Sequence, residues 1–152
     1  MIATVEQERA AVVTEARTWL RTPYHNLARI KGVGVDCAQL LIAVYCALEL
    51  TEEPDVGNYS PEWHLHHSEE QYLGWMEKYC RRVYAPLPGD IAMFRYGRCV
   101  SHGGIITRAE SGSAPWMVHS YITTGVIEEE LLTTGALFPR LDSFWSLNRW
   151  AP

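Results

Sequence analysis

A cysteine with the surroundings of a nucleophile stands at position 37 of this 152-residue chain. The preceding segment, GVGVD at residues 32–36, holds two glycines and an aspartate, and an apolar run follows. If Asp36 caps a helix, Cys37 lies in the first turn, where unpaired N–H groups and the helix dipole favour the thiolate over the thiol. The backbone N–H of Cys37 can also donate to the oxyanion that forms when the sulfur attacks a carbonyl. This pattern predicts a nucleophilic thiol.

Two histidines can supply the base that a nucleophilic cysteine needs and the group that orients the base. They are His102 in SHGGIIT and His119 in MVHSY. If their strands form a hairpin that turns near Glu110 and Ser111, the two histidines lie directly opposite each other, with Cβ atoms ~4.5–5.5 Å apart on one face. A one-residue shift of the turn would place them on different faces. The pattern predicts that His102 takes the thiol proton and that His119 holds the tautomer of His102.

The other three cysteines, Cys46, Cys80 and Cys99, lack such surroundings. With no CxxC pair and no dense cysteine framework, all four thiols are expected to be reduced. A free cysteine more often packs as a small hydrophobe than reacts, and we interpret these three in that way. Cys37 differs from them because of its place at a helix start.

Histidines also cluster in the segment WHLHHSEE, residues 63–70. His64, His66 and His67, together with Cys80, raise a zinc site as an alternative. Zinc sites usually take their ligands in pairs two to five residues apart on defined turns, and the sequence has no second pair. We therefore expect no metal and no other cofactor, and interpret the segment as a loop and helix start at the rim of a cleft.

The elements that must position these residues begin with helices. In three segments a short polar residue is followed three residues later by glutamine, which is a helix-start signal. The helices are expected from Thr4 to about Leu20, over residues 37–49 after Asp36, and over residues 68–85 from Ser68. The second is apolar almost all round, so we expect it to be the central buried helix. Residues 21–35 read as a loop fixed by Pro23.

Beyond Pro86 the pattern changes to short β-branched or aromatic runs between turn residues, which predicts strands. The runs are GDIAMF, CVSHGGIITR, APWMVHSYI and GVIEEEL, and FPRLDSFWSLNRW is expected to return as a closing strand. Helices followed by an antiparallel meander indicate an α+β fold, with N-terminal helices packed on an antiparallel sheet. At 152 residues, we expect one domain over residues 1–152.

Four segments, taken in order, resemble the NlpC-type cell-wall cysteine peptidases, and in particular their phage-encoded, tail-associated branch. They are RTPYHNLARIKGVGVDCAQL, YSPEWHLHHSEEQYL, LPGDIAMFRYGRCVSHGGIIT and WMVHSY. The resemblance implies a papain-like fold and cleavage of the γ-D-glutamyl–diaminopimelate bond in peptidoglycan stem peptides. It places Cys37 as the nucleophile, His102 as the base and His119 as the third member of a Cys-His-His triad. It also implies that Tyr24, Asp36 and Ser101 line the substrate side.

Two departures from the family pattern keep other functions open. Ala38-Gln39 stands where Ser-Gly usually follows the cysteine, and the loop after Tyr24 is longer than usual. One alternative is a non-catalytic phage tail-assembly or tail-tip protein with the same fold. Another keeps the nucleophile but uses it for acyl transfer or for hydrolysis of a different amide.

Charge and hydropathy limit the partners. The formal charge is −5 and the longest Lys/Arg run is Arg81-Arg82, so the chain lacks the basic face that nucleic acid requires. No window approaches ~18 uninterrupted apolar residues, so we expect no membrane span. The acidic N-terminal segment does not read as a signal peptide, which predicts cytoplasmic synthesis. The resemblance adds phage tail proteins as partners and the phage virion as a destination.

Overall fold

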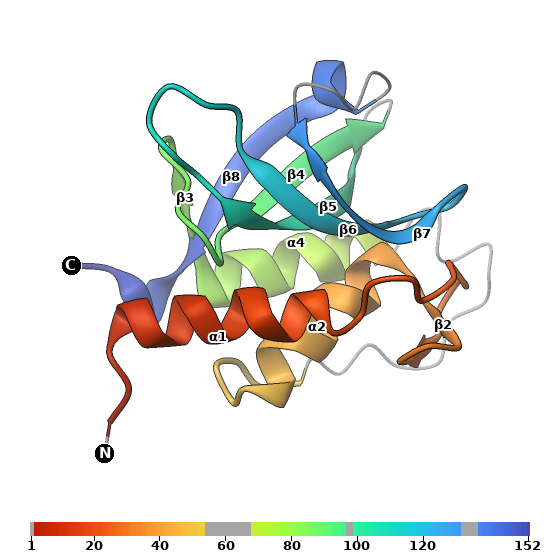
Figure 1. Ribbon diagram of the computed structural model, residues 1–152, viewed down its shortest axis with the longest axis horizontal. Helices are drawn as coiled ribbons and strands as arrows, with labels where there is room; N and C mark the ends of the chain where they lie inside the picture. Colours follow the sequence, from red (N-terminus) through yellow and green to blue (C-terminus); the bar gives the residue numbers. More distant parts are fainter. Residues whose placement is uncertain (1, 54–67, 97–98, 132–136) are drawn as a thin grey trace.

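The computed structural model describes residues 2–53, 68–96, 99–131 and 137–152. Helices α1 and α2 lie against one face of a strongly twisted antiparallel sheet (Figure 1), which confirms the predicted α+β class. The sheet has six strands in the order β3-β8-β4-β5-β6-β7. Within the described residues, no helix has the length and apolar character needed to cross a membrane.

The first two predicted helices begin where their capping signals place them. Helix α1 spans Val5–Arg17, and its N-cap Thr4 forms the complete reciprocal capping box with Gln7. It ends three residues before the predicted Leu20, since the chain turns there and Arg21 adopts a left-handed conformation. Helix α2 spans Cys37–Ala47 with Asp36 as its N-cap. Residues 39–45 of α2 are all buried, so α2 is the central helix as expected.

The third helix is shorter than predicted. Helix α4 spans Ser68–Tyr79, and the chain then continues as strand β3, Cys80–Val83. The predicted helix over residues 80–85 is therefore wrong, because Cys80–Val83 pairs antiparallel with the distant strand β8. The side chains of the predicted cap at Ser68 and the histidines at 64, 66 and 67 lie outside the described residues.

The predicted strands are present, in the predicted order. Strands β4 (Ile91–Tyr96), β5 (Cys99–Arg108), β6 (Trp116–Tyr121) and β7 (Gly125–Glu130) form a meander of antiparallel neighbours. The closing strand, β8 (Leu141–Leu147), inserts between β3 and β4. Short 3-10 turns at Phe138–Arg140 and Asn148–Trp150 flank β8. Two short strands outside this sheet, β1 (Arg29–Ile30) and β2 (Gly34–Val35), pair within the segment predicted to be a loop.

The sheet buries side chains on both faces because alternate residues of a strand point to opposite sides. Ile91 and Met93 of β4 pack in the same cluster as residues of α1 and α2, whereas Ala92 and Phe94 pack in a second cluster that contains no residue of an α-helix. The second cluster is formed by Ala92, Phe94, Ile106, Met117, Leu131 and Leu137. The sheet therefore separates a helix-facing core from a smaller core on its other face.

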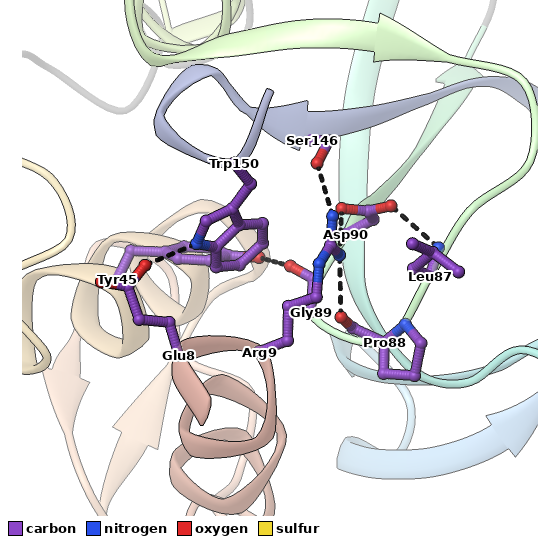
Figure 2. Close-up of polar contacts among 9 residues, drawn as sticks. All are labelled: Glu8, Arg9, Tyr45, Leu87, Pro88, Gly89, Asp90, Ser146 and Trp150. Carbon is purple, nitrogen blue, oxygen red and sulfur yellow. Dashed lines mark hydrogen bonds and ion pairs between the residues drawn. The ribbon is translucent and has the colours of Figure 1, made fainter. Parts of the chain in front are cut away.

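A buried ion pair ties α1 to the start of β4 (Figure 2). Arg9 Nη1 donates to Asp90 Oδ1 at 2.8 Å and to the carbonyl of Pro88 at 2.9 Å, while Arg9 Nη2 donates to Ser146 Oγ at 3.1 Å. The second oxygen of Asp90 accepts the N–H of Leu87 at 2.8 Å. These contacts, which we call the Arg9–Asp90 network, give the Pro88-Gly89-Asp90 turn a structural role.

The network extends to the C-terminal end of the chain and to α2. The guanidinium of Arg9 lies over the Trp150 ring, 4.3 Å from its centroid. Glu8 accepts a hydrogen bond from the Trp150 indole at 2.7 Å, and Tyr45 donates to the carbonyl of Gly89 at 2.6 Å (Figure 2). The network therefore joins α1, α2 and the C-terminal 3-10 turn to the residues that precede strand β4.

Candidate active site

Asp36 places Cys37 at the first residue of α2. Its backbone is extended, with φ −94° and ψ 177°, and its Oδ1 accepts the N–H of Gln39 at 2.7 Å. Its Oδ2 accepts the N–H of Leu27 at 2.8 Å, so the same carboxylate also holds the preceding loop. The predicted N-cap is therefore confirmed, and the cap makes Cys37 the first residue of α2.

The segment before Cys37 is held by β-type contacts. The Val35 N–H donates to the carbonyl of Pro23 at 3.0 Å, and the hydroxyl of Ser120 donates to the Val35 carbonyl at 2.7 Å. At Gly34 an added Cβ would lie 2.8 Å from the Cβ of His25, closer than such atoms approach. A glycine is therefore required there for the loop to pass close to its neighbour. These contacts link the Cys37 approach to strand β6.

His102 on β5 and His119 on β6 meet on one face of the sheet. His102 Nε2 lies 2.9 Å from His119 Nδ1, and the ring centroids are 5.1 Å apart at an interplanar angle of 85°. The predicted direct opposition is wrong, because Ile105 pairs with Val118 and this register sets His119 opposite Gly104. The offset from the prediction is two residues, which preserves the face. The histidines are diagonal neighbours that hydrogen-bond.

Gly104 makes the approach of the two strands possible at this point. A Cβ on Gly104 would lie 3.1 Å from the Cβ of His119 and 2.8 Å from the sulfur of Met117. The absence of a side chain therefore lets the His119 ring lean over β5 towards His102. The SHGG sequence serves this geometry, since the residue two positions after His102 lies under the second ring.

Glu129 extends the chain of contacts beyond the two histidines. His119 Nε2 lies 2.8 Å from Glu129 Oε1, and His119 itself has no exposed surface. Glu129 is on β7, diagonal to His119, which pairs with Ile127. Sequence reasoning missed this residue because Glu128–Glu130 reads as a solvated strand end. The available signal was the two-residue period of strand β7, which places Glu129 on the same face of the sheet as His119.

A cleft of about 220 Å³ brings the predicted residues together. Its lining includes Cys37 and His102 with two of the three residues expected on the substrate side, Tyr24 and Ser101. The third, Asp36, is not a lining residue: it is 2% exposed and binds backbone N–H groups. The remaining lining residues, which sequence reasoning missed, are Tyr96, Ser120, Tyr121 and Ile122.

The Cys37 thiol donates to the carbonyl of Ser101 at 3.6 Å. Burial raises the pKa of Cys37 to about 12, and the charge of Asp36 adds to the rise. Backbone N–H groups of Gly103, Ala38 and Cys37 itself lower this pKa, but by less. The expected lowering of the Cys37 pKa is therefore not found, because desolvation outweighs the N–H groups.

His102 is neutral for a related reason. Burial, with a smaller contribution from the neighbouring His119, lowers the pKa of His102 from 6.5 to about 3. Aromatic rings surround the imidazole: the centroids of Phe94 and Tyr121 lie 5.6 Å and 5.7 Å from its own. Burial also raises the pKa of the Tyr24 hydroxyl. Both pKa shifts favour the uncharged forms of the Cys37 thiol and the His102 imidazole.

Among the described residues, no group of three or more His, Cys, Asp and Glu side chains is arranged to hold a metal ion. The described thiols, those of Cys37, Cys46 and Cys80, are free. Cys80 is 4% exposed, and Cys46 is half-buried with its sulfur 3.7 Å from the Thr51 hydroxyl.

The fold is that of an NlpC/p60 domain. Among solved structures, the chain is similar to the NlpC/p60 domain of the peptidoglycan hydrolase SagA, with 17% identity, a TM-score of 0.58 and coverage of 91% of this chain and 97% of that one. It is also similar to NlpC1 from Trichomonas vaginalis (17% identity, TM-score 0.61, 96% of this chain) and to an NlpC/p60 family protein from Bacillus cereus ATCC 10987 (17%, 0.64, 90%).

The chain spans 47% of the Trichomonas protein and 39% of the Bacillus protein, so it corresponds to less than half of each. No protein-family model matches the sequence, and no curated protein matches it either. The similarity is therefore one of fold, and the roles of the cleft residues follow from their own geometry.

Proposed function

We propose that this chain is a cysteine peptidase that hydrolyses peptidoglycan stem peptides, with Cys37 as nucleophile, His102 as base and His119 as the orienting residue. One observation carries the proposal: Cys37 at a helix N-terminus and His102, hydrogen-bonded to His119, line the same cleft. Nucleophile, base and orienting group are the parts that covalent amide hydrolysis requires. The SagA domain of similar fold is described as part of a peptidoglycan hydrolase.

The reaction starts from an uncharged pair. Because the pKa of Cys37 is raised and that of His102 is lowered, proton transfer to His102 accompanies the attack of sulfur on the substrate carbonyl. The backbone N–H of Cys37 donates to the resulting oxyanion. His102 then returns the proton to the leaving amine, which leaves a thioester on Cys37. Water, deprotonated by His102, attacks the thioester and releases the acid and the free thiol.

Two finer parts of the proposal rest on the sequence resemblance to phage-encoded NlpC-type peptidases. The bond cleaved is the one between γ-D-glutamate and diaminopimelate, and the protein acts as part of a phage or prophage tail. Tyr24 and Ser101 line the cleft and are suited to contact the acyl part of a stem peptide. Asp36 acts by holding the loop and α2 in place.

The test is mass spectrometry of purified muropeptides incubated with the protein, with C37A as the inactive variant and C46A as the control. Cys46 lies on the same helix and is also a free, half-buried thiol. We expect a fragment pair split between D-glutamate and diaminopimelate with the wild type and C46A, and intact muropeptides with C37A. Equal cleavage by the C37A protein would refute the assignment of the nucleophile.

A non-catalytic tail protein with this fold is the second candidate, favoured by the raised pKa of Cys37 and by Ala38-Gln39 after it. The rate of Cys37 alkylation, followed by peptide mass spectrometry between pH 6 and 11, separates the two. A thiol assisted by His102 reacts at neutral pH, whereas an inert one reacts only as pH approaches its own pKa. Added glycine or hydroxylamine would reveal acyl transfer as new products.

A further inference from the structure

Two adjacent glutamates on β7, Glu128 and Glu129, have different surroundings. Glu128 accepts hydrogen bonds from Arg17 at 2.9 Å and from the Thr107 hydroxyl at 2.7 Å. Glu129 contacts His119 at 2.8 Å instead. Because neighbouring strand residues point to opposite faces, the two carboxylates lie on opposite sides of the sheet. Only the Glu129 side shares a face with the histidine pair.

The contact of Glu129 with His119 determines which nitrogen of each ring carries a proton. An ionised carboxylate has acceptor atoms only, so His119 Nε2 must be the donor in this bond. In a neutral imidazole the other nitrogen is then an acceptor. His119 Nδ1 therefore accepts, and the atom 2.9 Å away, His102 Nε2, must be protonated. This leaves His102 Nδ1 as a lone pair.

The burial of the two rings makes this assignment depend on protein groups rather than on water. His119 is 0% exposed and His102 is 6% exposed. The Tyr121 ring lies close to both histidines: its centroid is 5.7 Å from that of His102 and 5.9 Å from that of His119. Glu129 keeps 30% of its side-chain surface exposed, so the hydrogen-bonded array meets solvent at its carboxylate end.

We propose that Glu129 is a positioning residue, which fixes the tautomers of His119 and His102 and so keeps His102 Nδ1 available to accept the Cys37 proton. The inference rests on the roles proposed above for Cys37 and His102. Glu129 is not one of the residues that line the cleft, and it acts through the two rings. It therefore makes the site a four-residue array, Cys37–His102–His119–Glu129, rather than a triad.

The Glu129→Gln variant is the informative change because it keeps the size of the side chain. Its amide can donate to His119 Nε2, which would place the proton of His119 on Nδ1 and make His102 Nε2 the acceptor. The proton of His102 would then lie on Nδ1, where it blocks acceptance from the thiol. Glu129→Asp keeps an acceptor-only group, and Glu128→Gln is the matched control on the opposite face.

The experiment records ¹⁵N–¹H correlation spectra of the histidine side chains, together with the rate of Cys37 alkylation by iodoacetamide at pH 7.5. We expect both histidines of the wild type to carry the proton on Nε2. E129Q should show His102 protonated on Nδ1 and alkylation slowed about 10- to 100-fold, the range for loss of an orienting partner. E129D should keep the wild-type tautomers, and E128Q should match the wild type within about two-fold, as expected for a change that leaves His119 untouched.

Because the amide oxygen of E129Q can still accept from His119 Nε2, whereas E129A has no acceptor, wild-type tautomers and an unchanged alkylation rate in both variants would overturn the inference. If E129Q does not fold or keeps the wild-type tautomers, loss of the Nε2-protonated form in E129A, with retention in E129D, supports the inference, and unchanged tautomers in E129A overturn it. Neither readout uses peptidoglycan. A protein that shifts its tautomers as described but leaves muropeptides intact would refute the proposed hydrolysis alone.

Discussion

Two regions of this molecule contain buried ionisable side chains, but the side chains have different roles in the two regions. In the Arg9–Asp90 network, a charged pair has side chains 11% and 2% exposed, and both carboxylate oxygens bind internal donors. In the four-residue array, the two histidines are as deeply buried, but the array runs from a partly exposed carboxylate to the cleft. The first region is closed within the protein, and the second is open at both ends.

The effect of burial on each region depends on whether all its donors and acceptors are paired within the protein. A buried ion pair whose donors and acceptors are matched holds elements in place, and its loss leaves an uncompensated charge. A buried neutral imidazole has two tautomers and a lowered affinity for protons, so a small change in its partner alters its chemistry. We therefore expect changes in the network to act on stability and changes in the array to act on reactivity.

The largest expected effect is on reactivity. H102Q removes the base, and we expect muropeptide cleavage to fall by about 10⁴-fold or more, as for loss of a base from a catalytic unit. The melting temperature should stay close to that of the wild type, because no charged partner is left unpaired. H25Q is the control, since His25 is an exposed histidine in the nearby loop. Cleavage by H102Q at the rate of H25Q would contradict the role of His102.

The next effect is on stability. D90N removes the charge that pairs with Arg9 and leaves the guanidinium buried, so we expect a loss of about 3–5 kcal/mol in the free energy of unfolding. Denaturant titration measures this loss. R149Q is the control: Arg149 pairs with Glu8 at the same corner, but its side chain is 48% exposed, which predicts at most about 1 kcal/mol.

Alkylation of Cys37 under native conditions completes the D90N test. The network and the array share no residue, so the rate should match the wild type while the protein is folded. A D90N protein of normal stability and slow Cys37 would reverse the assignment of the two regions.

Local signals made the elements around the site predictable from the sequence. The caps at Thr4 and Asp36 need only residues three positions away, and both are present as expected. The pairing of His102 with His119 was predictable in face but not in register. Arg108 pairs with Trp116 and Ile106 with Met117, so the hairpin turns later in the chain than predicted and its register changes by one residue between these pairs. No short-range pattern encodes either feature.

Long-range contacts account for what the sequence did not reveal. Cys80–Val83 continues a helical pattern, but it becomes a strand because Leu147 and its neighbours in β8 pair with it. Glu129 gains its role from a ring on the adjacent strand. The pKa of Cys37 was expected to fall, and it rises because tertiary burial exceeds the local effect of the helix start. In each case the deciding partner is distant in sequence.

A smaller effect distinguishes the two regions by pH. The pKa of His102 is about 3 in the folded protein against an ordinary value of 6.5. Between these values the unfolded chain binds a proton that the folded protein does not, so acid favours unfolding. The free energy of unfolding of the wild type, relative to H102Q, should fall by about 1.4 kcal/mol per pH unit as pH drops from 6 to 4. Parallel curves for the two proteins would show that burial of His102 does not suppress its protonation.

The smallest effect probes a neutral member of the closed region. Y45F removes the hydroxyl that donates to the Gly89 carbonyl at 2.6 Å, while the ring keeps its contact with Trp75. The buried carbonyl of Gly89 then loses its hydrogen-bond donor. We therefore expect the free energy of unfolding to fall by about 1–2 kcal/mol. Y84F is the control, since Tyr84 is 87% exposed and its loss of a hydroxyl should cost less than about 0.5 kcal/mol. A Y45F loss as large as that of D90N would mean that the hydrogen bond to the Gly89 carbonyl, rather than the ion pair, holds this turn. Equal stability of Y45F and Y84F would mean that the charged pair alone holds it.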